Sequence, residues 1–175
     1  MIRMITAGDR KVMRRVNRWA PPLWVRHWMV FASRAGDGWG WVLFGFFVLL
    51  WGGDKRFAAL EAGLISVGAG QILFSVVKRL TGRARPCATE AHCWATLLPP
   101  DRFSFPSGHT ITAFAVAVPL GLFYPALLAP LIFCAMSVAS SRVLLGLHYL
   151  SDVIAGIAIG CLLGMASFSL LSAGF

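Results

Sequence analysis

Three short polar patches in an otherwise apolar chain hold the residues that could do chemistry. They read Lys78-x6-Arg85-Pro86, Pro106-Ser107-Gly108-His109 and Ser141-Arg142-x5-His148-x3-Asp152. Together they contain cationic side chains, two histidines and one carboxylate. A phosphoryl group undergoing displacement spreads negative charge over its equatorial oxygens, and fixed cations stabilise that charge. This set of residues therefore predicts a site that handles phosphate.

The third patch carries the strongest signal. From Thr110 to Phe175 the only charged residues are Arg142 and Asp152, and charge inside a membrane segment is costly enough to suggest function. His148 and Asp152 are four residues apart at a predicted helix start, so they share a face. A carboxylate bonded to one imidazole nitrogen would fix the tautomer and leave the other nitrogen for attack. An isolated His–Asp pair of this kind is structural as often as it is catalytic.

The first two patches add groups that can hold an anion. Residues 106–109 resemble a helix N-terminus, whose free N–H groups favour anions; Ser107 can cap and donate there, and Gly108 allows close approach. Taken alone, this tetrapeptide is more typical of an ordinary helix start. Arg85 can bind phosphate oxygens in a bidentate manner, whereas Lys78, at the end of an apolar run, could simply extend to the interface. We interpret Arg79 and Arg83 as interfacial, and His27 and His92 as incidental.

These patches must be positioned by membrane helices. Of the 175 residues 58% are hydrophobic and 13% charged, whereas soluble domains have about 25% charged residues. The chain is therefore predicted to be an all-α, polytopic transmembrane bundle. Five spans are expected, at residues 39–51, 57–77, 107–123, 125–142 and 148–171.

The N-terminal segment, residues 1–35, differs from the predicted catalytic domain, residues 36–175. Residues 5–20 predict a basic amphipathic helix on a membrane surface, and Pro21 and Pro22 interrupt it. Residues 23–35 are either an interfacial helix or a poor sixth span. Residues 36–38 predict a turn.

Helix alternation places all three patches at one face of the bilayer, because each patch lies at the end or start of consecutive spans. Lys55 and Arg56 fall on the opposite side, which favours a site facing the periplasm or exterior. If residues 21–35 cross the membrane, the basic N-terminus lies inside, which agrees with a site facing the exterior. If they do not cross, the basic N-terminus lies on the same side as the site, which disagrees with that orientation.

The net charge of +9 fits anionic lipid and a phosphorylated substrate better than nucleic acid, because the basic residues are not gathered on one soluble face. No metal-ligand set and no cofactor motif is evident, and neither is a signal for an obligate protein partner. Cys87 and Cys93 could form a disulfide in an oxidising compartment or remain free thiols.

The three patches resemble the three-part signature of the type 2 phosphatidic acid phosphatases, membrane lipid phosphatases related to vanadium haloperoxidases. Every fixed position matches, over roughly residues 38–172, although Leu150 stands where proline is expected. The resemblance implies that His148 attacks phosphorus, Asp152 orients it, and His109 protonates the leaving oxygen and then activates water. It also implies that the phosphoryl oxygens are held without metal by Lys78, Arg85, Ser107, Gly108 and Arg142.

The expected activity is hydrolysis of a lipid phosphomonoester or diphosphate in the bacterial cytoplasmic membrane. Candidate substrates are undecaprenyl or another polyprenyl diphosphate, phosphatidylglycerol phosphate, phosphatidic acid and lipid A phosphate. A phosphotransferase using the same site is the main alternative. A vanadate-dependent haloperoxidase is disfavoured by the oily chain, and a non-catalytic lipid-binding protein by the complete set of reactive residues.

Overall fold

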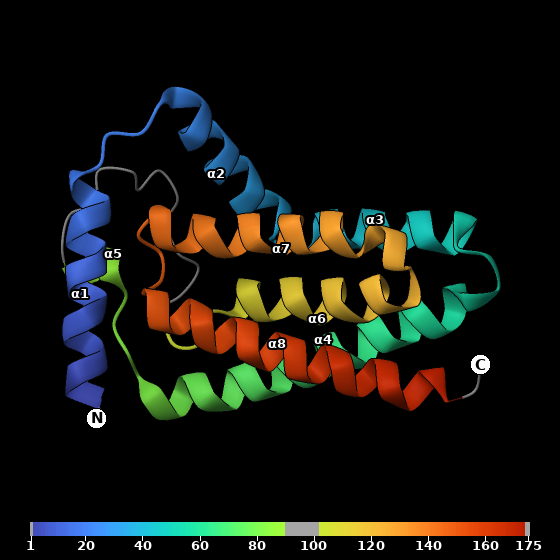
Figure 1. The fold of residues 1–175 in the computed structure, drawn as a ribbon. Coiled ribbons are helices and arrows are strands. Elements are labelled where there is room, and N and C mark those ends of the chain that lie inside the picture. Colours follow the sequence, from blue (N-terminus) through green and yellow to red (C-terminus); the bar gives the residue numbers. More distant parts are fainter. Residues whose placement is uncertain (1, 90–101, 174–175) are drawn as a thin grey trace.

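The computed structural model describes residues 2–89 and 102–173, and this part of the chain is almost entirely helical (Figure 1). The elements in chain order are α1 (Ile2–Arg18), α2 (Leu23–Ala35), α3 (Trp39–Trp51), the 3-10 turn η1 (Gly53–Lys55), α4 (Arg56–Thr81), α5 (Pro86–Thr89), α6 (Gly108–Phe123), α7 (Pro125–Leu144) and α8 (Leu150–Ser172). The five predicted apolar helices are present as α3, α4, α6, α7 and α8, which confirms the all-α bundle.

Helix α6 forms the centre of the bundle and packs against α4, α7 and α8 (Figure 1). Most of its residues are buried, including Ile111 and Phe114. Helix α8 approaches it through glycines that recur every fourth residue, at Gly156, Gly160 and Gly164. Small residues at such a crossing let two backbones come close, which is a common way to pack membrane helices.

Among the described residues, three helical stretches are long and apolar enough to cross a bilayer: Gly53–Thr81, Pro125–Leu144 and Leu150–Ser172. Helices α3 and α6 are apolar but shorter, with 13 and 16 residues. A helix of that size rises about 20–24 Å, less than the roughly 30 Å hydrocarbon core. The exposed apolar side chains of α3, among them Phe46 and Leu50, suit contact with lipid.

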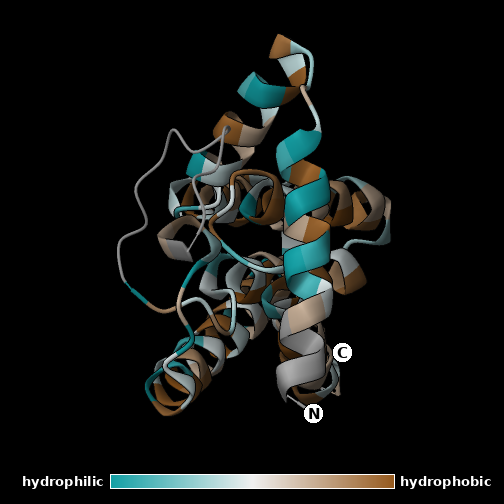
Figure 2. Ribbon diagram, turned by 90° about the vertical axis from the view of Figure 1, so that its left-hand side faces the viewer, coloured by the Kyte–Doolittle hydropathy of each residue, from teal (hydrophilic) through white to brown (hydrophobic). Residues whose placement is uncertain are grey.

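Helix α1 is amphipathic, as predicted, but its apolar face packs against the protein itself. Met13 is buried in the same apolar cluster as Tyr149 and Val153 near the start of α8. The opposite face is exposed and carries Arg10, Lys11, Arg14, Arg15 and Arg18. Figures 1 and 2 show α1 lying across the end of the bundle, with many hydrophilic residues along it.

Helix α2 begins near this same end of the bundle and packs against α7. It has 13 residues and is not among the stretches long enough to cross. The turn at residues 36–38 follows it, as predicted. The basic α1 and the three patches thus lie at the same end of the bundle. Because basic residues are more frequent on the cytoplasmic side of membrane proteins, this arrangement argues against a site facing the exterior. The division into segments at residues 35 and 36 stays a prediction.

Candidate active site

The first and second patches are brought side by side where α4 ends and α6 begins. Gly82 ends α4 in the left-handed conformation, with φ of 55°, which glycine adopts without strain. The chain then pairs with the segment before α6: Ala84 bridges Phe103, and the N–H of Ser104 donates to the carbonyl oxygen of Arg83 at 2.7 Å. This pairing fixes the backbone positions of Arg83 and Arg85.

The third patch is folded onto the other two by a tight turn between α7 and α8. Gly146 has a φ of 69°, and the N–H groups of Leu147 and His148 both donate to the carbonyl oxygen of Arg142 at 3.0 Å. The N–H of Ser107 donates to the carbonyl oxygen of Asp152 at 3.1 Å. The three patches therefore meet at one end of the bundle, as helix alternation predicted.

His148 is held by a hydrogen bond at each ring nitrogen. Its Nε2 lies 3.0 Å from Nη1 of Arg85, and its Nδ1 lies 2.6 Å from the carbonyl oxygen of Ser104. A guanidinium only donates and a carbonyl only accepts. Nε2 must therefore be the unprotonated nitrogen while Nδ1 carries the proton.

The orienting role predicted for Asp152 stays a prediction, because the carboxylate lies beside the imidazole but is not the closest partner of Nδ1. The nearest oxygen of Asp152 lies 3.6 Å from Nδ1 of His148, beyond hydrogen-bond distance. The carbonyl of Ser104 lies closer to Nδ1 because the chain before α6 passes directly beside the imidazole. Asp152 remains next to the ring as a buried negative charge that can stabilise an imidazolium or a phosphorylated histidine.

The two oxygens of Asp152 bind other groups. Oδ2 accepts from the N–H of Tyr149 at 2.8 Å, and Oδ1 accepts from Nη1 of Arg83 at 2.7 Å. The interpretation of Arg83 as merely interfacial is therefore wrong. Its position inside the first patch was the available signal, but a basic residue at a helix end is so common in membrane proteins that spacing alone did not distinguish it.

The environment of His148 favours the neutral imidazole. Burial lowers the pKa of His148 from 6.5 to about 4; the carboxylate of Asp152 opposes that shift, and the charges of Arg142 and Arg85 add to it. A neutral histidine whose Nε2 carries no proton is the form that can attack an electrophile.

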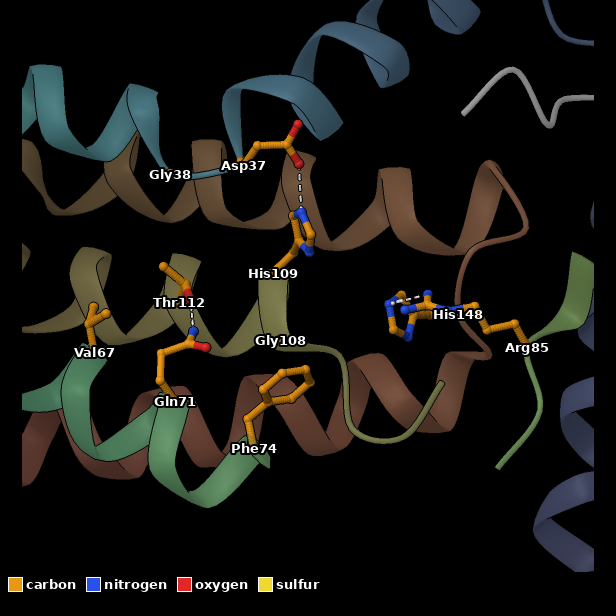
Figure 3. A pocket seen from close by; sticks show the side chains of 11 residues that line it. Asp37, Gly38, Val67, Gln71, Phe74, Arg85, Gly108, His109, Thr112 and His148 are labelled. Carbon is orange, nitrogen blue, oxygen red and sulfur yellow. Dashed lines mark hydrogen bonds and ion pairs between the residues drawn. The ribbon is translucent and has the colours of Figure 1, made fainter. Parts of the chain in front are cut away.

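His109 faces the same cavity as His148. The cavity has a volume of about 350 Å³, within the usual range for a ligand site. Figure 3 shows His148 beside Arg85, and His109 with Gly108 at the start of α6. Gln71 and Phe74 of α4 lie below them. Nε2 of His109 lies 2.7 Å from Oδ1 of Asp37. Asp37 lies between two glycines, where an aspartate is typical of a turn, so the sequence does not single it out as a site residue.

The remaining predicted phosphate-binding residues surround this cavity without forming its lining. Nζ of Lys78 lies 4.4 Å from the centre of the Phe74 ring. Ser107 is buried and its Oγ accepts from Thr110 at 2.9 Å. Arg142 is also buried, with Nη1 bound to Oγ of Ser33 at 2.5 Å. Their roles at a phosphate stay predictions.

Within the described residues no cluster of three or more histidine, cysteine, aspartate or glutamate side chains could hold a metal ion. The possibility of a Cys87–Cys93 disulfide stays open, because Cys93 lies outside the described residues, as does His92.

A family model of the PAP2 superfamily matches residues 60–174 of the sequence, a stretch that contains all three patches. The chain belongs to the PAP2 superfamily. The resemblance drawn from the motifs is thereby confirmed, and the matched region spans α4 to α8, the helices that position both histidines.

Several curated relatives of this chain are named as phosphatases. Lipid A 1-phosphatase of Rhizobium johnstonii is 39% identical over 106 residues, which cover 58% of this chain and 41% of that protein. Decaprenylphosphoryl-5-phosphoribose phosphatase of Mycolicibacterium smegmatis is 38% identical, covering 53% and 51%. Phosphatidylglycerophosphatase B of Bacillus subtilis is 31% identical, covering 57% and 52%. The chain spans about half the length of the curated relatives it matches.

Two solved structures share the fold. The first transmembrane PAP2 type phosphatidylglycerolphosphate phosphatase from Bacillus subtilis superposes with a TM-score of 0.73 at 23% identity, covering 97% of this chain and 85% of that one. Aquifex aeolicus LpxE gives 0.76 at 24%, covering 91% and 93%. At these identities the likeness establishes the architecture of the PAP2 bundle.

Proposed function

We propose that this PAP2 protein is an integral membrane phosphatase that hydrolyses a lipid phosphomonoester or diphosphate through a phosphohistidine at His148. The observation that carries the proposal is the state of its Nε2. That nitrogen is unprotonated, receives a hydrogen bond from Arg85 at 3.0 Å, and lies in a cavity that it shares with His109. A nucleophile, a cation and a second histidine at one cavity are the parts that phosphoryl transfer needs.

The reaction follows from these positions in two steps. In the first, Nε2 of His148 bonds to phosphorus while the bond from phosphorus to the leaving oxygen breaks, and His109 gives that oxygen a proton. In the second, His109 takes a proton from water, whose oxygen bonds to phosphorus as the phosphorus–nitrogen bond breaks. Asp152 offsets the positive charge that develops on His148. The phosphoryl oxygens are stabilised by Arg85, Lys78, Arg142, Ser107 and the N–H of Gly108.

The lining of the cavity supports a lipid as the substrate. Its polar end lies at Arg85 and the two histidines, whereas along α4 it continues past Phe74 and Gln71 to Val67. Val67 precedes Lys78 by 11 residues, which is about 16 Å along a helix and therefore well below the end of α4. A molecule with a phosphate at one end and an apolar body fits this gradient.

The identity of the lipid is a finer proposal. The relatives are named for action on lipid A, on a decaprenyl-linked sugar phosphate and on phosphatidylglycerophosphate. We propose a polyprenyl diphosphate, such as undecaprenyl diphosphate, or a glycerophospholipid such as phosphatidylglycerol phosphate as first choices, followed by phosphatidic acid and lipid A phosphate.

The test is phosphate release by the purified protein in detergent against a panel of these lipids. His148→Ala should abolish release while the protein remains folded, and His27→Ala, a histidine on α2, is the matched control. An acid-labile phosphoenzyme should form in the wild type and not in His148→Ala. Full activity of His148→Ala would refute the nucleophile assignment. Transfer of phosphate to a second lipid, without free phosphate, would favour the phosphotransferase alternative.

We also propose that the site faces the exterior of the bacterial cytoplasmic membrane. Lys55 and Arg56 at the opposite end of the bundle support this orientation, whereas the basic face of α1 at the site end opposes it. Single cysteines introduced at Arg10 and at Asp54, in a background without the native cysteines, would decide. Labelling of the Arg10 cysteine by a membrane-impermeant maleimide in intact cells is expected, and labelling of only the Asp54 cysteine would reverse the orientation.

A further inference from the structure

The N-terminal helix α1 is attached to the active site through one inward-facing carboxylate. Asp9 is the only acidic residue among residues 1–35, and it is 5% exposed although the helix is otherwise strongly basic. Its Oδ1 accepts from the N–H of Ser151 at 3.0 Å, and its Oδ2 accepts from Oγ of Ser151 at 2.6 Å. Ser151 lies in the first turn of α8, where a free N–H group and the helix dipole favour a carboxylate.

Arg83 joins this carboxylate to Asp152. Its Nη2 lies 2.6 Å from Oδ2 of Asp9, and its Nη1 lies 2.7 Å from Oδ1 of Asp152. The guanidinium also lies over the ring of Tyr149, at 4.3 Å from its centre. A planar guanidinium that binds two carboxylates with different nitrogens and stacks on an aromatic ring has little rotational freedom.

The consequence for His148 is geometric. The second oxygen of Asp152 is the one 3.6 Å from Nδ1 of His148. The rotation of that carboxylate, and so its distance from the imidazole, is set by Arg83 on one side and by the N–H of Tyr149 on the other. Arg83 in turn is oriented by Asp9. Asp9, Arg83 and Asp152 thus connect α1 to the nucleophile, and none of the three lines the cavity.

We infer that Asp9 and Arg83 are positioning residues, through which the docking of α1 sets the orientation of Asp152 beside His148. This inference rests on the proposed function and goes beyond it by assigning a catalytic effect to a helix outside the three motifs. Outer-shell partners of metal ligands, which hold a reactive side chain in a similarly indirect way, typically affect activity by about ten- to a hundredfold. Because Arg83 does not contact the cavity, its loss should lower kcat and leave KM nearly unchanged.

The experiment compares Asp9→Asn, Arg83→Gln and the double variant in detergent, using the lipid phosphate that the wild type hydrolyses. Asp9→Asn keeps the size of the side chain and removes its charge. The matched controls are Arg10→Gln, which removes a charge from the exposed face of the same helix, and Arg79→Gln, in the last turn of α4. We expect kcat to fall about tenfold in Asp9→Asn and up to about a hundredfold in Arg83→Gln, with both controls near wild type.

A double-variant comparison separates positioning from general stability. If Asp9 acts through Arg83, the double variant should be no slower than Arg83→Gln alone. A purely structural α1 would instead lower the melting temperature of the variants and leave kcat unchanged in the folded fraction. That outcome, or two effects on kcat that simply multiply, would overturn the inference. Should Arg83→Gln fail to fold, Asp9→Asn and Asp9→Glu decide, because normal kcat in both would equally overturn it.

The wild type distinguishes the two proposals. A wild-type protein that forms no phosphoenzyme and releases no phosphate from any lipid would contradict the proposed function. A wild type that is active together with fully active Asp9 variants would contradict the positioning role alone.

Discussion

Replacing Gly156 by alanine should slow catalysis without removing any reactive group. Gly156 lies on α8, one turn after Asp152, against the start of α6. A Cβ there would lie 2.9 Å from the carbonyl oxygen of Ser107 and 2.9 Å from Cβ of Thr110. A backbone carbonyl at the head of α6 cannot rotate out of the way, so the two helices must separate.

The size of the effect follows from these distances. Ordinary contact between such atoms is near 3.4 Å or more, so the start of α6 must move by about 0.5 Å relative to α8. Overpacking of this kind costs about 1–3 kcal/mol of stability. A misplacement of about 1 Å in an active site can cost about a hundredfold in rate, so half of that predicts a loss of about tenfold in kcat. The affected distance is that between His109, on α6, and His148, before α8.

Gly164→Ala provides the matched control. Its Cβ would be equally crowded, at 2.9 Å from both Cδ of Pro119 and Cβ of Val118, but it lies about 12 Å further along α8. Both variants should lower the thermal unfolding temperature in detergent, whereas only Gly156→Ala should lower kcat for phosphate release. Equal kcat values for the two variants would refute the argument that this crossing sets the distance between the histidines.

Three further predictions concern the site. Asp37→Asn should lower kcat about tenfold, because it removes the charge 2.7 Å from His109. Asp54→Asn, in η1, is the control. An unchanged kcat in Asp37→Asn would exclude a catalytic effect of Asp37. Burial lowers the pKa of His148 from 6.5 to about 4, so between these pH values the unfolded chain binds more protons than the folded protein. The free energy of unfolding should therefore fall by about 3 kcal/mol as the pH drops from 6.5 towards 4. Thermal unfolding of the wild type and His148→Gln across that range checks this, since the variant should lack that part of the fall. Phosphate release should survive EDTA, because Arg85 and its neighbours supply positive charge; strict dependence on added magnesium would contradict this scheme.

The helical bundle and the meeting of the three patches were accessible from the sequence. Runs of apolar residues indicate membrane helices, and helices that alternate in direction bring every second end to the same face. Charge is rare in these helices, so Arg142 and Asp152 were conspicuous. The arrangement of the helices could be predicted because a membrane permits few kinds of spanning element and makes successive helices alternate in direction.

The hydrogen bonds of His148 were not accessible in the same way. Spacing places Asp152 on the same helix face as His148, but it does not show that the chain before α6 passes even closer. Ser104 contributes a backbone carbonyl, and a carbonyl is present at every residue, so no residue type in the sequence signals it. Contacts that depend on the backbone of a loop require the folded structure.

The carboxylates show where reasoning from the sequence was too narrow. The chain has seven acidic residues, and in the part that the structure describes three of them lie at the site: Asp9 on Arg83, Asp37 on His109 and Asp152 beside His148. Only Asp152 was recognised, because it lies in an apolar helix where charge is costly. Asp9 lies in a basic helix and Asp37 in a glycine turn, where an aspartate is ordinary.

Acidic residues are scarce in the whole chain, however, and not only in its membrane helices. In a protein with a net charge of +9, three of the few negative groups lie beside two histidines and one arginine, where they offset fixed positive charge. Asp9 and Asp152 share Arg83, whereas Asp37 lies at His109, so these carboxylates hold an arginine and a histidine in fixed positions around the site.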